Sequence, residues 1–280
     1  MTLNLPIDPA LPGQDRDSLY RMSEALRLSF ERTGLTLHGS RVLHGIAHHV
    51  CRQTTDWHHG DAVQPPQGYR IRLVDLRRNL GLERANGNAA LRAGLQDLLK
   101  LQFFEHCELA NANQWLDFKL AANAFDCLFD QVPYGLFDIR QVQLLSTPLD
   151  FLIYETVGVQ RSRRAPDLTL FLGTDDDPSP STLAWRRLRP KLISSLQKSA
   201  AIFDLQFLAI CRAEGTRIGI DELTIRIRSA KTVWSAKSFV SLPVSARKVF
   251  LIDKHECLEG SRSDLSQLST KFFCAQLCPE

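Results

Sequence analysis

The sequence lacks the features that mark several common classes of protein. It has no apolar run near the roughly 18–20 residues that a membrane-spanning helix needs. Its first segment, MTLNLPIDPALPGQDRD, has Pro and Asp where a secretory signal has a basic start and an apolar middle. The phosphate-loop pattern GxxxxGK, the nucleophile elbow GxSxG and the zinc-protease motif HExxH are absent. We therefore expect a soluble cytoplasmic protein that has no membrane contact, binds no cofactor and is not an enzyme.

Metal ligands are also sparse. His44, His48 and Cys51 share one helical stripe, and Cys274 and Cys278 are spaced CxxxC, but neither set has a partner motif that would complete a zinc site. The seven cysteines are scattered through a long chain without a secretory signal, which favours reduced thiols over a disulfide framework. We expect no bound metal.

The charge of the chain is small but unevenly distributed. The net charge is +3, yet residues 159–248 carry 16 Lys/Arg against 8 Asp/Glu. Residues 1–158 carry 15 against 18, and residues 249–280 carry 3 against 5. A local basic excess of this size commonly marks a surface that binds a polyanion, although a solvated basic surface is the plain alternative.

One pattern occurs twice, near residues 69–121 and 182–228. In each copy an amphipathic helix runs into a strand–turn–strand hairpin, the order of a winged helix. The chain is long enough for two domains of ordinary size. We predict an α+β fold of two tandem winged-helix domains, mainly helical with small antiparallel β wings. The predicted segments are a flexible arm (1–17), a first domain (18–133), a second, DNA-binding domain (134–250) and a C-terminal tail (251–280).

The helix predicted over residues 185–202 has an apolar and a cationic side. Trp185, Leu188, Leu192 and Leu196 cluster on the apolar side at about 100° per residue. Such a helix suits a DNA major groove, where guanidinium groups reach guanine edges and Lys or Ser holds phosphates. An ordinary surface helix is the alternative. The cationic side carries Arg187, Lys191, Ser194 and Lys198, with Arg186 at its margin, and these residues are predicted to contact DNA.

Further cations surround this helix in the sequence. Five belong to the following hairpin, whose strands we expect to grip the DNA backbone: Arg212, Arg217, Arg226, Arg228 and Lys231. Arg161, Arg163 and Arg164 form a basic loop that fits either a DNA contact or plain solvation. The first copy is poorer in charge, with Arg77, Arg78, Asn88 and Arg92 as its candidate DNA contacts. Protein–protein contact, including self-association, is the rival interpretation of that first copy.

The chain resembles the Rep family of plasmid replication initiators, which bind iteron repeats through two winged-helix domains. The resemblance rests on four segments covering roughly residues 40–230: IRLVDLRRNLGL with AALRAGLQDLLKLQFFE, FDIRQVQLLSTPLDFLIYETVG, WRRLRPKLISSLQKSAAI and FLAICRAEGTRIGIDELTIRIR. It implies binding to double-stranded DNA at repeated origin sites, recruitment of host helicase machinery, and a dimer that represses its own promoter. The resemblance also implies that the base contacts come from Arg186, Arg187, Arg189, Lys191, Ser194 and Lys198, with the hairpin residues on the DNA backbone. A winged-helix transcription regulator, a protein-interaction adaptor and an unrecognised enzyme are the alternatives.

Overall fold

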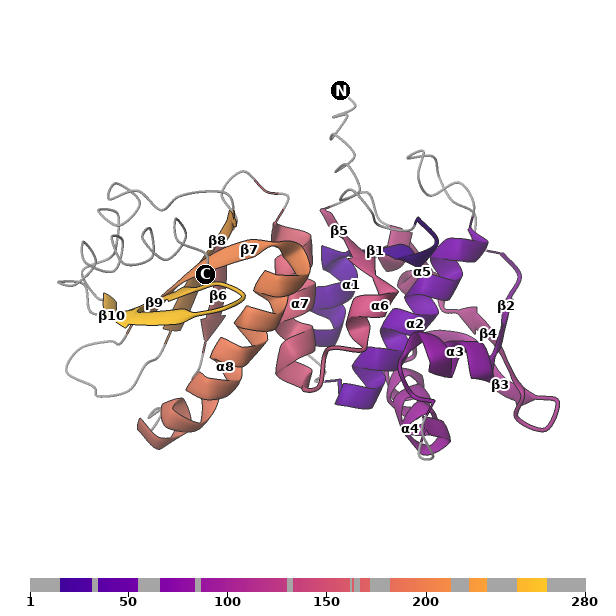
Figure 1. Cartoon of the computed structure of the whole chain (residues 1–280). Helices are drawn as coiled ribbons and strands as arrows, with labels where there is room; N and C mark the ends of the chain where they lie inside the picture. Colours follow the sequence, from indigo (N-terminus) through magenta and orange to yellow (C-terminus); the bar gives the residue numbers. More distant parts are fainter. Residues whose placement is uncertain are drawn as a thin grey trace, which may run out of the picture. The chain divides into compact units, whose positions relative to one another are not determined.

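The structure is a computed structural model of the 280-residue chain, shown in Figure 1. It describes residues 16–31, 35–54, 66–83, 87–129, 133–161, 163, 167–171, 182–212, 222–230 and 246–260. The chain forms two compact units, residues 1–162 (unit 1) and residues 163–280 (unit 2). Most of the arm predicted over residues 1–17 lies outside the described residues.

Unit 1 contains most of the helices. After a short 3-10 turn, Arg16–Ser18, its elements are β1 (Leu19–Ser23), α1 (Glu24–Glu31), α2 (Leu37–Gln53), β2 (Tyr69–Arg72), α3 (Leu73–Asn79), α4 (Gly87–Lys100), β3 (Phe104–Ala110), β4 (Trp115–Leu120), α5 (Ala122–Phe129), β5 (Tyr134–Asp138), α6 (Ile139–Val142) and α7 (Pro148–Gln160). They include a three-stranded sheet in the order β2-β4-β3 and a two-stranded sheet of β1 and β5.

The order predicted for residues 69–121 is confirmed: strand β2, helices α3 and α4, then the antiparallel hairpin β3–β4. Leu91, Leu95 and Leu98 are buried along one face of α4, as their spacing predicts. Gly94 lets α4 approach α2 closely, because a Cβ there would collide with the backbone carbonyl of His38. Packing of α4 on α2 thus fixes the hairpin that follows α4.

The segment after residue 133 belongs to unit 1, which differs from the predicted domain boundary. Strand β5 pairs antiparallel with β1, from Leu19 opposite Asp138 to Ser23 opposite Tyr134. Helix α7 follows, begun by a capping box between Thr147 and Asp150 with Pro148 in the first turn. The units divide after residue 162, and α7 packs on α1, α2, β1 and β5, all of them elements of unit 1.

A chain of buried hydrogen bonds ties β1, α2 and α7 together. The hydroxyl of Tyr20 contacts Nδ1 of His44, whose Nε2 lies 2.9 Å from Oε1 of Glu155. Burial raises the pKa of Tyr20 well above its usual value, so its hydroxyl stays protonated and donates a hydrogen bond to Nδ1. Nε2 of His44 then carries the hydrogen that Glu155 accepts. Each of these polar groups is thereby satisfied inside the core.

Unit 2 is built on a larger sheet than the predicted small wing. Its elements are β6 (Asp167–Phe171), α8 (Thr182–Phe203), β7 (Leu205–Arg212), β8 (Glu222–Ser229), β9 (Ala246–Ile252) and β10 (Cys257–Gly260). The five strands are antiparallel, in the order β10-β9-β7-β8-β6. Strands are present at β7 and β8, as the sequence predicts, and the two pair with each other antiparallel. The turn expected at 213–216 and the strand expected at 217–220, which were to form the hairpin with β7, lie outside the described residues.

The extra strands, β9 and β10, come from the end of the predicted second domain and the start of the predicted tail. In β9, Val249 and Leu251 lie on one face of the sheet and Phe250 and Ile252 on the other, and all four are buried. A strand that is apolar on both faces has no polar–apolar alternation, so its sequence carries no period-2 signal. The residues that complete the sheet therefore extend to Gly260, well into the predicted tail of residues 251–280.

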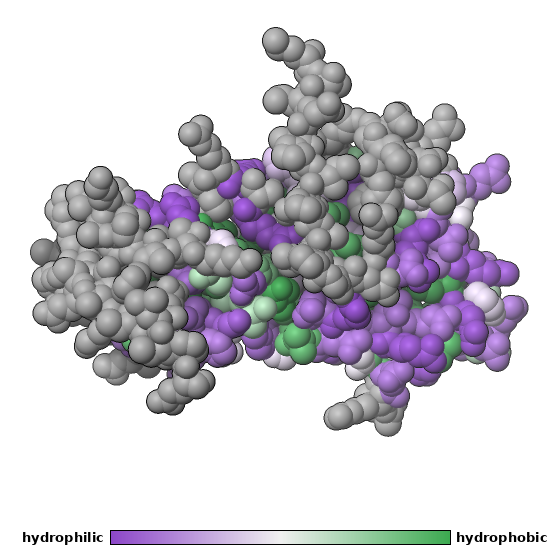
Figure 2. Space-filling view, turned by 45° about the horizontal axis from the view of Figure 1, so that its top comes forward, coloured by the Kyte–Doolittle hydropathy of each residue, from purple (hydrophilic) through white to green (hydrophobic). Residues whose placement is uncertain are grey.

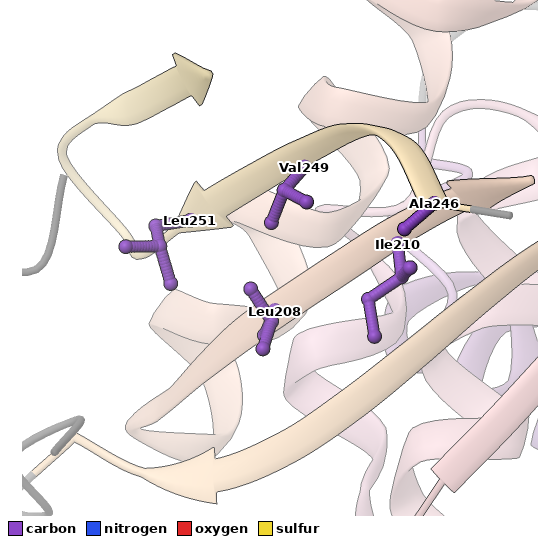
Figure 3. Packing of buried hydrophobic residues seen from close by; sticks show 5 residues of the cluster. All are labelled: Leu208, Ile210, Ala246, Val249 and Leu251. Atoms are coloured by element: carbon purple, nitrogen blue, oxygen red, sulfur yellow. The ribbon is translucent and has the colours of Figure 1, made fainter. Parts of the chain in front are cut away.

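The two faces of this sheet have different neighbours. Helix α8 lies against the face that carries Phe250, because the guanidinium of Arg189 from α8 sits 5.3 Å from the centre of that ring. Figure 3 shows a separate apolar cluster contributed by β7 and β9. Its buried members are Leu208, Ile210, Ala246, Val249 and Leu251. Register pairs Leu208 with Leu251 and Ile210 with Val249, which places them on the face away from α8.

The described surface offers little apolar area. Its exposed large apolar side chains are Leu99, Leu109 and Leu144. In Figure 2 the described residues are mostly hydrophilic, with small separate green patches between them. None of the described helices is long and apolar enough to cross a membrane.

Candidate nucleic-acid interface

Helix α8 carries the main candidate surface, and its two sides follow the predicted pattern where side chains are described. Leu192 is 3 % exposed and Leu196 is fully buried, so the apolar side faces the core of unit 2. Burying each of these leucines contributes about 1.5–3 kcal/mol to folding. Arg187, Lys191 and Ser194 are exposed on the other side. The side chains of Trp185 and Arg186 lie outside the described residues.

We call Arg187, Lys191 and Ser194 the outward row of α8. Neither Arg187 nor Lys191 forms an ion pair with a described residue. Both cations can therefore meet an anionic ligand without first leaving a described carboxylate. Lys198, predicted to belong to the same set, is only half-exposed and already has an interaction within the protein.

Arg189 is the exception among the helix cations, because its guanidinium is engaged inside unit 2. It forms an ion pair with the carboxylate of Glu259 on β10, which also accepts a hydrogen bond of 2.8 Å from Nζ of Lys248 on β9. The ring of Phe250 lies beneath the guanidinium. Only the family resemblance implied a DNA contact for Arg189, and nothing local in the sequence shows that a carboxylate 70 residues away holds it.

Two of the predicted hairpin cations, Arg226 and Arg228 on β8, do not lie on the α8 side of the sheet. Arg226 pairs in register with Leu208, so both lie on the face away from α8, and Arg228 lies two residues further along the same face. Arg226 approaches Asp167 at 4.0 Å, and Arg228 donates to the carbonyl of Ile227. A duplex lying along the outward row of α8 does not reach this face directly.

The remaining hairpin and loop cations are dispersed. Arg212 forms an ion pair of 3.1 Å with Glu222 across the β7–β8 pairing. Arg161 donates to the carbonyl of Leu136 inside unit 1, while Arg163 is exposed in unit 2. The other predicted contacts, Arg164, Arg217 and Lys231, lie outside the described residues.

The candidate contacts of unit 1 are partly engaged with one another and with acids. Nη1 of Arg77 donates to Oδ1 of Asn88 at 3.1 Å, joining α3 to the start of α4. Arg78 lies 3.7 Å from Asp75 and 3.5 Å from Glu83. Only one cation of this set, Arg92 on α4, is exposed and without an ion pair to a described residue. Unit 1 thus presents a weaker cationic surface than the outward row of α8.

His44, His48 and Cys51, noted as possible metal ligands, have other partners, whereas Cys274 and Cys278 lie outside the described residues. His44 is held by Tyr20 and Glu155, and Nε2 of His48 lies 2.9 Å from the carbonyl oxygen of Asp17. Burial raises the pKa of Cys51 to about 12, so its thiol stays protonated at neutral pH. Within the described part of the chain, no three His, Cys, Asp or Glu side chains gather as metal ligands do.

Two thiols lie in the sheet beneath α8. Burial raises the pKa of Cys211 to about 12 and that of Cys257 to about 11. Both are therefore neutral thiols. Among the described residues at this place, the charged groups are Arg189, Lys248 and Glu259. The site as described can attract and orient an anion, and it holds no activated sulfur nucleophile.

Of the comparisons with known proteins, the one with solved structures gives a match. No protein-family model and no curated protein matches the chain. Among solved structures, it is similar to a Pi initiator protein crystallised in complex with iteron DNA. The match covers 78 % of this chain and 100 % of the other, with a TM-score of 0.53 and 12 % sequence identity. The predicted likeness to replication initiators is thus confirmed for the mixed helix-and-sheet fold.

Proposed function

We propose that this protein is a plasmid replication initiator that binds double-stranded DNA at repeated origin sites. The observation that carries the proposal is the outward row of α8, whose two cations lie exposed on a core-anchored helix without an ion pair to any described residue. The fold in which that helix sits resembles one whose solved example holds iteron DNA. In this interpretation unit 1 is a winged-helix domain, and unit 2 is a second one whose wing is enlarged into the five-stranded sheet.

The outward row determines how α8 meets the duplex. Arg187 can donate two parallel hydrogen bonds to a guanine edge in the major groove, which specifies sequence. Lys191 and Ser194 can hold phosphate oxygens, which fixes register but carries no sequence information. Binding of this kind is not catalysis, so we propose a non-enzymatic initiator. Self-association as a dimer, repression of its own promoter and recruitment of a host helicase belong to the same proposal.

We expect binding to duplex DNA to weaken steeply with salt. Each phosphate neutralised by Lys or Arg releases condensed counterions, so three to five contacts give a log–log slope of about −3 to −4.5. Fluorescence anisotropy of a labelled duplex, titrated with the full chain between low and physiological salt, measures this slope. A slope near zero, or no binding at low salt, would contradict duplex binding.

Initiation is tested separately from binding. A plasmid whose only initiator gene encodes this chain, together with the DNA that flanks the gene, should replicate in a host that lacks another initiator for it. Direct repeats about two helical turns apart in that DNA would place successive sites on one face of the duplex. A protein that binds the flanking DNA but fails to maintain the plasmid would instead be a transcription regulator.

A further inference from the structure

Helix α8 contains Pro190 in its interior. Pro190 has no N–H to donate to the carbonyl of Arg186, and its ring crowds that carbonyl, so the helix is weakest at this point. The described side chains that anchor α8 by full burial all follow Pro190: Leu192, Ser195, Leu196, Ser199, Ala200 and Phe203. The segment before it carries the exposed Arg187 and the half-buried Leu188. Of the side chains described in that segment, Leu188 and Arg189 are the two that are partly buried and could anchor it to unit 2.

Arg189 supplies such an anchor directly before Pro190. Its guanidinium is paired with Glu259 of β10 and lies over Phe250 of β9, a ring that is only 2 % exposed. Lys248 of β9 holds the second oxygen of the same carboxylate at 2.8 Å. We call Arg189, Lys248, Phe250 and Glu259 the Glu259 clamp. It connects the segment before Pro190 to the outermost pair of strands in the sheet.

The clamp is stronger than an isolated surface ion pair. A single half-exposed pair contributes little to stability, because solvent screens it and two long side chains must be ordered. Here one carboxylate binds two cations from different elements, and the guanidinium plane is also fixed on an aromatic face. The clamp needs to supply only enough free energy to favour one orientation of the short helical segment before Pro190.

Arg189 could instead be a direct DNA contact, as the family resemblance implied. Its guanidinium would then have to leave the carboxylate and the Phe250 ring before it reached a phosphate or a base. Arg187, two residues earlier, has no such described carboxylate to leave. The geometry therefore separates the cations of α8 into a group that is open to a ligand and one that is held by the sheet.

We propose that Glu259 is a positioning residue for DNA recognition, acting through Arg189 to set the orientation of the α8 segment before Pro190. This inference rests on the proposed function, in which that segment carries Arg187 into the groove. It also gives β10 a role: a four-residue strand in the predicted tail is required for recognition, although it does not itself touch DNA.

The test is Glu259→Gln, which keeps the size of the side chain and removes its charge. The amide oxygen can still accept a hydrogen bond from one of them, but Arg189 and Lys248 then lie side by side without a negative charge between them, and the clamp weakens. We expect the affinity of the full chain for a specific duplex to fall about fivefold to tenfold, close to the effect of a pair plus a ring contact. Loss of a negative charge alone would tighten binding to a polyanion, so the sign separates positioning from simple electrostatics.

Asp204→Asn is the matched control. It removes the same charge from a residue just after α8 that is also ion-paired, to Lys254 at 3.8 Å. We expect unchanged or slightly tighter duplex binding. Positioning also predicts that Glu259→Gln has no further effect once Arg189 has been changed to Gln. Tighter binding by Glu259→Gln, binding equal to that of Asp204→Asn, or an undiminished effect in the Arg189→Gln background would each overturn the proposal.

A measurement without DNA distinguishes failure of the clamp from failure of the proposed function. Amide hydrogen exchange reports local opening of a helix. In Glu259→Gln we expect the peptide that spans residues 182–191 to exchange several-fold faster, and the peptide that spans 192–203 to keep its wild-type rate. Equal rates in wild type and variant would refute the clamp whether or not the chain binds DNA. Faster exchange in a chain that binds no duplex would leave the clamp standing and refute the DNA function.

Discussion

Replacing Arg187 and Lys191 together by Ala should weaken binding to a specific duplex by at least about 1–3 kcal/mol, the loss expected when Arg187 no longer reaches a base edge, and the lost phosphate contact of Lys191 adds to it. Both side chains are exposed and without ion pairs to described residues, so their removal leaves the core of unit 2 unchanged. Alanine is a good helix former, and α8 should remain folded. Anisotropy titrations of the wild type and the double variant, at one salt concentration, measure the difference directly.

The control for this double variant is Lys100→Ala with Lys119→Ala in unit 1. It removes the same number of charges from exposed side chains that are not among the candidate contacts. Its expected effect is below about 1 kcal/mol, because only the general attraction to a polyanion changes. Equal losses of affinity in the two double variants would mean that binding depends on net charge alone and that α8 does not read the DNA.

Glu155→Ala should lower the free energy of unfolding of unit 1 by about 3–5 kcal/mol. The change leaves the Nε2–H group of His44 buried without an acceptor, next to a cavity, and removing one partner of a buried pair is costly. It also removes the hydrogen bond between α2 and α7, and α2 is in turn bonded to β1 through Tyr20. Chemical denaturation followed by circular dichroism gives the change in stability.

Two further variants check the cause of that destabilisation. Glu155→Gln keeps an acceptor oxygen for His44 and should cost clearly less than Glu155→Ala. Glu105→Ala removes a carboxylate from an exposed pair with Lys119 and should change stability by less than about 1 kcal/mol. If all three variants unfolded at the same denaturant concentration, the hydrogen bonds through His44 would contribute nothing to the fold.

The sequence predicted best those elements whose signal is local. The helix α4 and the hairpin β3–β4 follow from the spacing of leucines and from alternation along β4. The turn between the strands places Asn111, Ala112 and Asn113 at positive φ, a conformation that asparagine tolerates. These features require only neighbouring residues, so they can be predicted without knowing the rest of the fold.

The elements that were missed depend on distant partners. Leu19, Met22 and Leu26 have helical spacing, yet residues 19–23 form strand β1, because β5 pairs with them from more than 100 residues away. Tyr20 and Met22 do alternate with the polar Arg21 and Ser23, but this run is short and overlaps the helical spacing, and all four residues are buried. The same pairing moved the boundary between the units from residue 133 to residue 162.

The candidate site was also predicted only in part, because its local pattern can be seen in the sequence and its distant contacts cannot. A helical wheel separates the outward row of α8 from its buried leucines, and the structure agrees. The wheel does not reveal that Arg189 is held by Glu259, or that Arg226 lies on the face of the sheet away from α8. Both facts follow from the register of strands β7 to β10, which no local pattern encodes.

Photo-crosslinking from Ser194 is the most direct test of the central claim that the outward row of α8 lies against duplex DNA. A photoreactive amino acid at this exposed position should crosslink efficiently to a specific duplex, and the same group at Thr169 should not. Thr169 is also exposed in unit 2, but it pairs in register with Thr224 on the face of the sheet away from α8. Crosslinks from Thr169 with none from Ser194 would place the DNA on the other face and contradict the account.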